Sequence, residues 1–181
     1  IVAQLREFLR EDPEEKIITF MCNWCSYAGA DSAGIGHFEY PPDSRGIRVM
    51  CSARMDSDFI LEAFRRKAGM VLVSGCHPQD CHYITGQPVA AKRFGRLGRT
   101  LERMGINPER FRVEWISAAE GEKYARVITE MSDKLHSFDK EQLKAENVAA
   151  TPAIEKRLRR WKASPVMAEL MKEEEKEKVM S

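Results

Sequence analysis

Three short apolar runs, each followed within two residues by a cysteine, constrain the fold of this chain more than any other feature. The runs are residues 16–21, 47–50 and 70–74. Each is rich in β-branched or large apolar side chains, as strands buried on both faces usually are. The first stops at Cys22, the second ends on Cys51, and the third reaches Cys76 after one glycine. The sequence therefore predicts buried strands that each end at a sulfur atom.

Segments with helical periodicity separate these strands. The predicted helices are residues 27–35, 56–68, 88–104 and 121–135, and a fourth strand is predicted at residues 111–116. In residues 56–68 the apolar side chains fall on one helical face, and Gly69 is expected to end that helix. The alternation predicts an α/β fold: a mainly parallel sheet of about four strands, with right-handed crossovers and helices on both faces.

The composition changes near residue 138, so we expect an α/β domain at residues 1–137 and a charged, helical C-terminal tail at residues 138–181. Pro152 and Pro165 interrupt the tail, and residues 172–178 are all lysine or glutamate. One interpretation is a solvated helix. The other is an arm whose apolar residues pack on another subunit. Those residues are Ile154, Leu158, Trp161, Val166, Leu170 and Met171.

The overall composition argues against several classes of partner. The net charge is only +1, with 31% charged and 43% hydrophobic residues. Such a chain has no long-range field to attract nucleic acid or an anionic membrane. No run approaches the ~20 apolar residues that span a bilayer, and residues 1–10 carry too many charges for a secretory leader. We expect a cytoplasmic protein that binds neither nucleic acid nor membrane.

The five cysteines are the candidate metal ligands. An odd number cannot pair completely in disulfides, which a reducing cytoplasm does not favour in any case. Because the carboxyl ends of parallel strands share one edge of a sheet, the three strand-end cysteines should stand side by side there. Cys25 and Cys81 follow within the next loop or turn. We therefore predict one metal site, the alternative being that some of these cysteines are merely small buried apolar residues.

The spacing favours a two-iron cluster over zinc. Four thiolates suit either zinc or an iron–sulfur cluster. Paired C-x2-C motifs usually stabilise short zinc-bound hairpins, whereas this chain already has an α/β core. The C-x4-C spacing also recurs in plant-type 2Fe–2S proteins. The simplest ligand set places Cys22 and Cys25 on one iron and Cys76 and Cys81 on the other, which leaves Cys51 as a spare thiol beside the cluster.

Four further residues are expected to act on such a cluster. His77 and His82 each follow a cysteine, and we expect them to hydrogen-bond near the cluster rather than to ligate iron as in Rieske centres. Arg54 lies just beyond Cys51, where it is either a solvated residue or a donor that stabilises the reduced cluster. Trp24 stands between two cysteines and could shield the cluster from water, mark a docking face, or do both.

No complete acid–base or nucleophile constellation is present, so no catalytic residue is expected. Two other classes of function stay open. Cys22-Asn-Trp-Cys25 is similar to a thioredoxin-type dithiol, although that interpretation leaves three cysteines unexplained. A zinc-stabilised adaptor without redox activity is the other alternative.

Four segments carry a resemblance to a known family. They are Cys22-Asn-Trp-Cys25-Ser-Tyr-Ala-Gly-Ala-Asp31, Tyr40-Pro-Pro42, Ile47-Arg-Val-Met-Cys51-Ser-Ala-Arg54 and Val73-Ser-Gly-Cys-His-Pro-Gln-Asp-Cys-His-Tyr83. Over about residues 15–137 the chain resembles the delta (iron–sulfur) subunit of the methyl-viologen-reducing NiFe hydrogenase of methanogens.

The resemblance implies a function in electron transfer. Such a subunit carries a 2Fe–2S cluster and passes electrons from a hydrogenase, or a formate dehydrogenase in some organisms, to the flavin-bearing subunit of heterodisulfide reductase. There the flavin splits electron pairs between ferredoxin and the heterodisulfide of coenzymes M and B. The resemblance thus implies a relay subunit without catalysis of its own, and the same domain also occurs fused to other reductase subunits.

Overall fold

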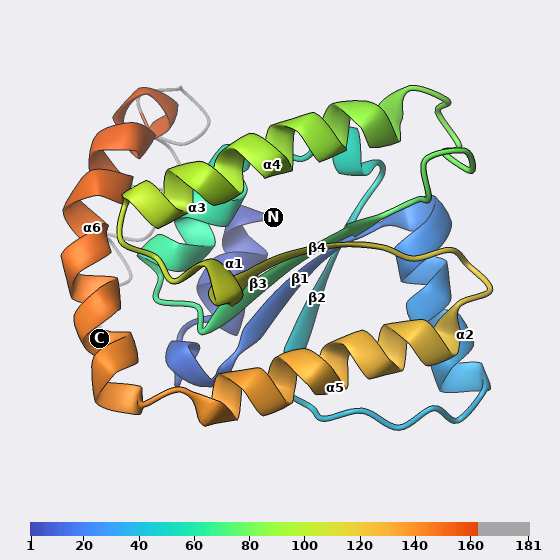
Figure 1. Ribbon diagram of the computed structural model, residues 1–181, viewed down its shortest axis with the longest axis horizontal. Helices are drawn as coiled ribbons and strands as arrows, with labels where there is room; N and C mark the ends of the chain where they lie inside the picture. The colour runs from blue at the N-terminus through green and yellow to red at the C-terminus, as the bar shows by residue number, and fades with distance from the viewer. Residues whose placement is uncertain (163–181) are drawn as a thin grey trace.

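A computed structural model describes residues 1–162 and shows one four-stranded, fully parallel sheet (Figure 1). The strands are β1 (Ile17–Cys22), β2 (Ser44–Val49), β3 (Met70–Gly75) and β4 (Phe111–Trp115). Their spatial order is β2-β1-β3-β4. The chain therefore runs outward from β1 to β2 and then crosses to the other side of β1, which places the topological switch point between β1 and β3.

Helices cover both faces of the sheet, as predicted (Figure 1). They are α1 (Val2–Phe8), α2 (Ala28–Ile35), α3 (Ser57–Arg65), α4 (Gly86–Arg103), α5 (Gly121–Ser137) and α6 (Lys140–Lys162). The first, third and fourth pack on one face, while α2 and α5 pack on the other. None of the helices within residues 1–162 has the length and apolar character needed to cross a bilayer.

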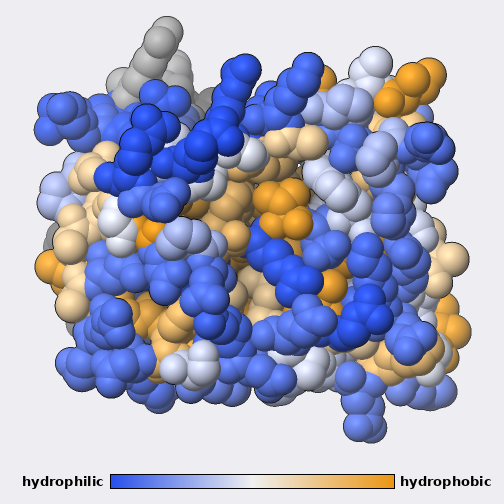
Figure 2. Space-filling model, viewed as in Figure 1, coloured by the Kyte–Doolittle hydropathy of each residue, from blue (hydrophilic) through white to orange (hydrophobic). Residues whose placement is uncertain are grey.

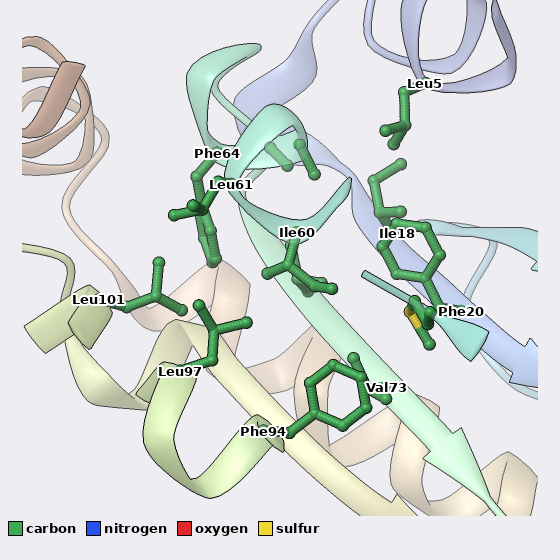
Figure 3. Packing of buried hydrophobic residues seen from close by; sticks show 14 of the residues in the cluster. Leu5, Ile18, Phe20, Ile60, Leu61, Phe64, Val73, Phe94, Leu97 and Leu101 are labelled. Carbon is green, nitrogen blue, oxygen red and sulfur yellow. The ribbon is translucent and has the colours of Figure 1, made fainter. Parts of the chain in front are cut away.

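Alternating residues of the strands belong to two hydrophobic cores, one on each face of the sheet. Ile18 and Phe20 of β1 point to the face covered by α3 and α4, where they meet Ile60 and Phe94 (Figure 3). Their neighbour Met21 contributes to the core under α5 instead. This division follows from the two-residue period of a strand. Neither core includes any of the five cysteines.

The helix ends differ in detail from the predictions. The α3 helix begins after Asp56, whose carboxylate accepts the backbone N–H of Asp58 at 3.2 Å, as an N-cap should. Gly69 was expected to end α3, but the residue with a left-handed conformation after this helix is Lys67, with φ of 67°. Gly69 is required for another reason: a Cβ there would lie only 2.2 Å from the carbonyl oxygen of Glu14.

The described part of the tail forms α6, which is helical and charged as expected but is not solvated all round. Ile154 and Leu158 are fully buried in the core that α3 and α4 share, and the Trp161 ring packs edge-on against Phe59 at 5.8 Å. Ile154 and Leu158 are thus covered within the chain itself, and the packing of the tail on another subunit stays a prediction. Val166, Leu170 and Met171 lie outside the described residues, and the division at residue 138 stays a prediction.

A buried arginine, which the sequence analysis missed, fixes α6 at the amino end of the sheet. The Arg110 guanidinium donates to the carbonyl oxygens of Ala68 and Gly69, at 2.7 and 2.8 Å. It also donates to Asn147 Oδ1 at 2.8 Å and pairs with Glu146, both on α6. Burial lowers the pKa of Arg110, and the pairing with Glu146 opposes that shift. The amino edge is therefore closed by protein, and the carboxyl edge carries the candidate site.

Candidate metal centre

The carboxyl edge of the sheet gathers all five cysteines, as the sequence predicts. Cys22 is the last residue of β1, Cys76 directly follows β3, and Cys51 lies two residues beyond β2. Cys25 sits in a π-helical turn, Asn23–Tyr27, and Cys81 sits in the loop before α4. All five are buried free thiols. Four of them, Cys22, Cys25, Cys76 and Cys81, form one contiguous buried cluster.

Two of the sulfur atoms that touch come from the ends of neighbouring strands. Cys22 Sγ lies 3.8 Å from Cys76 Sγ. Two thiolates that each sit about 2.3 Å from a tetrahedral metal are about 3.8 Å apart. The observed separation is compatible with two ligands on one metal ion, and it is equally that of two thiols in contact. Which cysteines share an iron stays a prediction.

Cys51 lies at the side of this cluster, next to the start of α4. A Cβ on Gly86, the first residue of α4, would stand 2.9 Å from Cys51 Sγ and 3.1 Å from Cys81 Sγ. Only glycine lets the helix approach the two sulfurs this closely without displacing them. Gly86 is thus a residue of the site that the sequence analysis did not identify.

The surroundings of the thiols shift their pKa values in different directions. The contact with Cys76, together with the backbone N–H groups of Trp24 and Ser52, lowers the pKa of Cys22 to about 6. The same contact with Cys22 raises the pKa of Cys76. Burial raises the pKa of Cys25 and of Cys51. The contact between the two thiols thus favours the thiolate form of Cys22 and the protonated form of Cys76.

The donor set fits an iron–sulfur cluster. The five donors are soft thiols, and backbone N–H groups reach the sulfurs of Cys22, Cys51 and Cys76. Hydrogen bonds of this kind are one of the means by which proteins set cluster potentials. Within residues 1–162, no three or more histidine, cysteine, aspartate or glutamate side chains already stand in a metal-holding arrangement.

An aromatic group covers the outer side of the cysteine loops. The indole of Trp24 stacks on the imidazole of His82, with ring centroids 3.9 Å apart. Its Nε1–H donates to the hydroxyl of Tyr83 at 3.1 Å. Trp24 remains 41% exposed, so one part of the ring faces solvent. The structure thus joins Trp24 and His82, and it adds Tyr83, which the sequence analysis did not single out.

His77 has a partner of its own. Its Nε2 lies 2.6 Å from Glu120 Oε2, and the same carboxylate accepts the backbone N–H of Ser117 at 2.6 Å. The Ser117 bond and then His77 lower the pKa of Glu120 to about 2. An ionised Glu120 therefore contacts Nε2 of His77. Glu120 lies 43 residues away in the sequence, so only the fold brings it next to His77.

Arg54 reaches the cysteines through its main chain. Its backbone N–H acts on Cys51, as does that of Ala53. The side chain is exposed and lines a groove of about 460 Å³, and Cys51 itself is part of the same wall. The other lining residues are Met50, Ala53, Tyr83, Thr85, Gly86 and Val89. The proposed effect of the guanidinium on a cluster stays a prediction.

Comparison with known proteins gives one consistent family. The family model described as methyl-viologen-reducing hydrogenase, delta subunit, matches residues 17–139. The vhc iron-sulfur subunit of the F420-non-reducing hydrogenase of Methanococcus voltae is 47% identical over 130 residues, covering 72% of this chain and 90% of the relative. The iron-sulfur subunit of the F420-non-reducing hydrogenase of Archaeoglobus profundus is 47% identical over 122 residues, covering 67% of this chain and 89% of the relative.

A longer relative contains a similar segment. It is one subunit of the ferredoxin/F(420)H(2)-dependent CoB-CoM heterodisulfide reductase of Methanosarcina acetivorans, which is 41% identical over 156 residues. This match covers 86% of the chain and only 20% of the relative. A stretch of that length necessarily includes most of α6, so the similarity extends beyond the α/β sheet.

Proposed function

The chain belongs to the family of the methyl-viologen-reducing hydrogenase delta subunit, and from this premise we propose that it holds a 2Fe–2S cluster and relays electrons between two partner proteins. The observation that carries the proposal is the gathering of five buried thiols from three strand ends at one edge of the sheet. The names of the hydrogenase relatives, which describe them as iron-sulfur subunits, support an iron–sulfur group.

Four residues would hold the cluster: Cys22, Cys25, Cys76 and Cys81, the members of the contiguous buried group. When bound, a 2Fe–2S cluster accepts and releases single electrons. Backbone N–H groups stabilise negative charge on the sulfurs, and Trp24 with His82 limits the access of water from outside. Cys51 stays beside the cluster as a neighbouring thiol. In this proposal no bond of a substrate is made or broken on the chain.

The partners in this proposal are a hydrogenase, or a formate dehydrogenase, on the donor side and the flavin-containing subunit of heterodisulfide reductase on the acceptor side, all in the cytoplasm. Relatives named as hydrogenase subunits support the first. The similarity to a segment within heterodisulfide reductase supports the second, because a module fused to that protein in one organism is well placed to bind it in another.

Anaerobic purification tests the proposal. We expect a brown protein with two iron and two sulfide per chain, whose visible bands bleach with dithionite. Replacing each cysteine by serine should abolish iron binding at Cys22, Cys25, Cys76 and Cys81 and retain it at Cys51. A colourless protein with no iron would overturn the proposal, and loss of the cluster in the Cys51→Ser variant would overturn the ligand set.

The same samples separate the alternatives. Zinc in place of iron would identify the adaptor. A thioredoxin-type dithiol needs an accessible attacking thiolate, yet Cys22 is fully buried and its lowered pKa comes first from Cys76 rather than from a helix end. Alkylation that labels a single thiol in an iron-free protein would nevertheless revive that function.

A further inference from the structure

We propose that the groove beside α4 is the docking face for a redox partner that presents an apolar anchor surrounded by acidic residues. This inference rests on the proposed function, because a docking face for a redox partner is needed only if the chain transfers electrons. It draws on three observations: exposed apolar side chains beside Cys51, a strained and exposed residue on the adjoining loop, and nearby cations without acidic partners.

The apolar part of the groove lies against the sulfur atoms. Met50, Tyr83 and Val89 line it, each about half exposed, and Cys51 forms part of its wall. Figure 2 shows a small hydrophobic patch, bordered by hydrophilic side chains, at the corner of the molecule where the loop before α4 lies. An apolar group seated here would touch residues next to the proposed cluster. Of the five cysteines, Cys51 is the one that lines this groove.

Ile84, at the tip of the same loop, combines strain with exposure. It adopts a left-handed conformation, with φ of 61°, and is 82% exposed. A β-branched residue is a genuine outlier in this conformation. Strained residues cluster at binding and active sites, where the surrounding structure maintains them. A large apolar side chain held outward in this way gains burial only when a partner covers it.

The charged part of the groove continues along α4. A second hollow of about 400 Å³ is lined by Lys92, Arg93, Arg96 and Arg157, and Val89 lines both hollows. Figure 2 shows the corresponding row of strongly hydrophilic side chains over α4. Arg93 is engaged, since it donates to the carbonyl oxygens of Ala53 and Met55 at 2.6 Å each.

Three cations at the groove have no acidic partner within residues 1–162: Arg54, Lys92 and Arg96. The net charge of the whole chain is only +1, so this positive region is local. An apolar centre with a charged rim is the usual anatomy of an interface, and charge complementarity steers a partner to it. A second copy of this chain would bring like charges together in a two-fold contact, which leaves an acidic protein surface as the complementary occupant.

Binding measurements with charge-reversed variants test this assignment. The probes are the purified hydrogenase and the purified flavin-containing subunit of heterodisulfide reductase from the organism that encodes the chain, each immobilised and offered the full-length, iron-loaded protein. The test variants are Lys92→Glu with Arg96→Glu, and separately Val89→Glu. Arg126→Glu is the control, because Arg126 is an exposed cation on α5, across the sheet.

We expect the wild-type chain to bind one of the probes at low salt. The affinity of the Lys92→Glu/Arg96→Glu variant for that probe should be about tenfold lower or more, because the charges that steer the partner and surround the contact have been reversed. Val89→Glu should also weaken binding, and Arg126→Glu should not. High salt should shrink the difference between wild type and the double variant.

Three outcomes would overturn the docking face: iron-loaded wild type that binds neither probe, a double variant that binds as tightly as Arg126→Glu, or association only with itself. Iron content and the visible spectrum are measured on every sample before binding. A colourless wild-type protein would count against the proposed function, whereas a normal cluster with unaltered binding in the variants would count against the docking face alone.

Discussion

The indole of Trp24 lies nearly parallel to the imidazole of His82, with an angle of 15° between the ring planes. Trp24 belongs to the turn after β1, and His82 belongs to the loop after β3. The stack therefore joins the two loops that carry four of the five cysteines. It holds them together on the side of the site that faces solvent.

Removal of this stack should make the cluster easier to extract. Trp24→Ala would separate the loops and admit water, so we expect iron to be lost to a chelator severalfold faster than from wild type. Trp24→Phe keeps an aromatic face for His82 and should lose iron at nearly the wild-type rate. Equal rates in the alanine variant and wild type would show that the stack does not protect the site.

Gly86→Ala should disturb the site without disturbing the rest of α4. The added methyl group would lie 2.9 Å from Cys51 Sγ, closer than side-chain atoms normally come. We expect less iron per chain and an altered visible spectrum. Gly95→Ala is the matched control on the same helix, where a Cβ meets nothing within 4 Å. That variant should bind iron normally and gain about 1 kcal/mol in the free energy of unfolding.

Arg110→Ala should destabilise the fold and leave the site chemistry intact. The change would leave the Glu146 carboxylate and the carbonyl oxygens of Ala68 and Gly69 without their hydrogen-bond donor. Breaking a buried pair in this way typically costs about 3–5 kcal/mol. Urea denaturation of the iron-free variant measures the loss. Arg126→Ala, on an exposed helix face, should change the free energy of unfolding by about 0.5 kcal/mol or less.

Removal of the metal should leave the protein folded. Both hydrophobic cores lack cysteine, and four of the five cysteines form a separate buried cluster. The far-ultraviolet circular dichroism of chelator-treated protein should therefore match that of the iron-loaded form. Metal-dependent unfolding, as in small zinc domains, would contradict this interpretation of the cores.

Glu120 should contribute to stability in a pH-dependent way. Its pKa is lowered from 4.5 to about 2 in the folded chain, mainly by the Ser117 N–H. A group with a lowered folded pKa stabilises the fold above its unfolded pKa, and this contribution disappears as the pH falls through the folded value. Wild type should therefore be more stable than Glu120→Gln above pH 4.5, and the two should converge toward pH 2. Denaturant midpoints of the iron-free proteins across this pH range check this, and Glu102→Gln serves as a control for the loss of an exposed carboxylate.

The strands and the meeting of the cysteines were predictable because both follow from local patterns and one topological rule. Apolar runs marked β1 and β3, and the crossover rule placed Cys22 and Cys76 at the same edge. No sequence pattern, however, specifies which sulfurs touch. Pairing by proximity in the chain favoured Cys22 with Cys25, whereas the 3.8 Å contact joins Cys22 to Cys76 across two neighbouring strands.

The rest could not be inferred from the sequence because it depends on tertiary contacts. Arg110 resembles any surface arginine before a strand until α6 covers it. The apolar residues of α6 are widely spaced among charges, so composition suggested a solvated helix although Ile154 and Leu158 are buried. A weak signal did exist: Ile154 and Leu158 stand four residues apart, at the spacing of one helical face.

The way α6 straddles the two cores has a practical consequence for anyone who wishes to transplant this module. Leu143 belongs to one core, while Ala150, Ile154 and Leu158 belong to the other. A chain cut at residue 137 would therefore expose apolar surface of both cores. A portable unit therefore has to include α6 at least as far as Leu158, and a graft onto a foreign reductase should keep this helix attached.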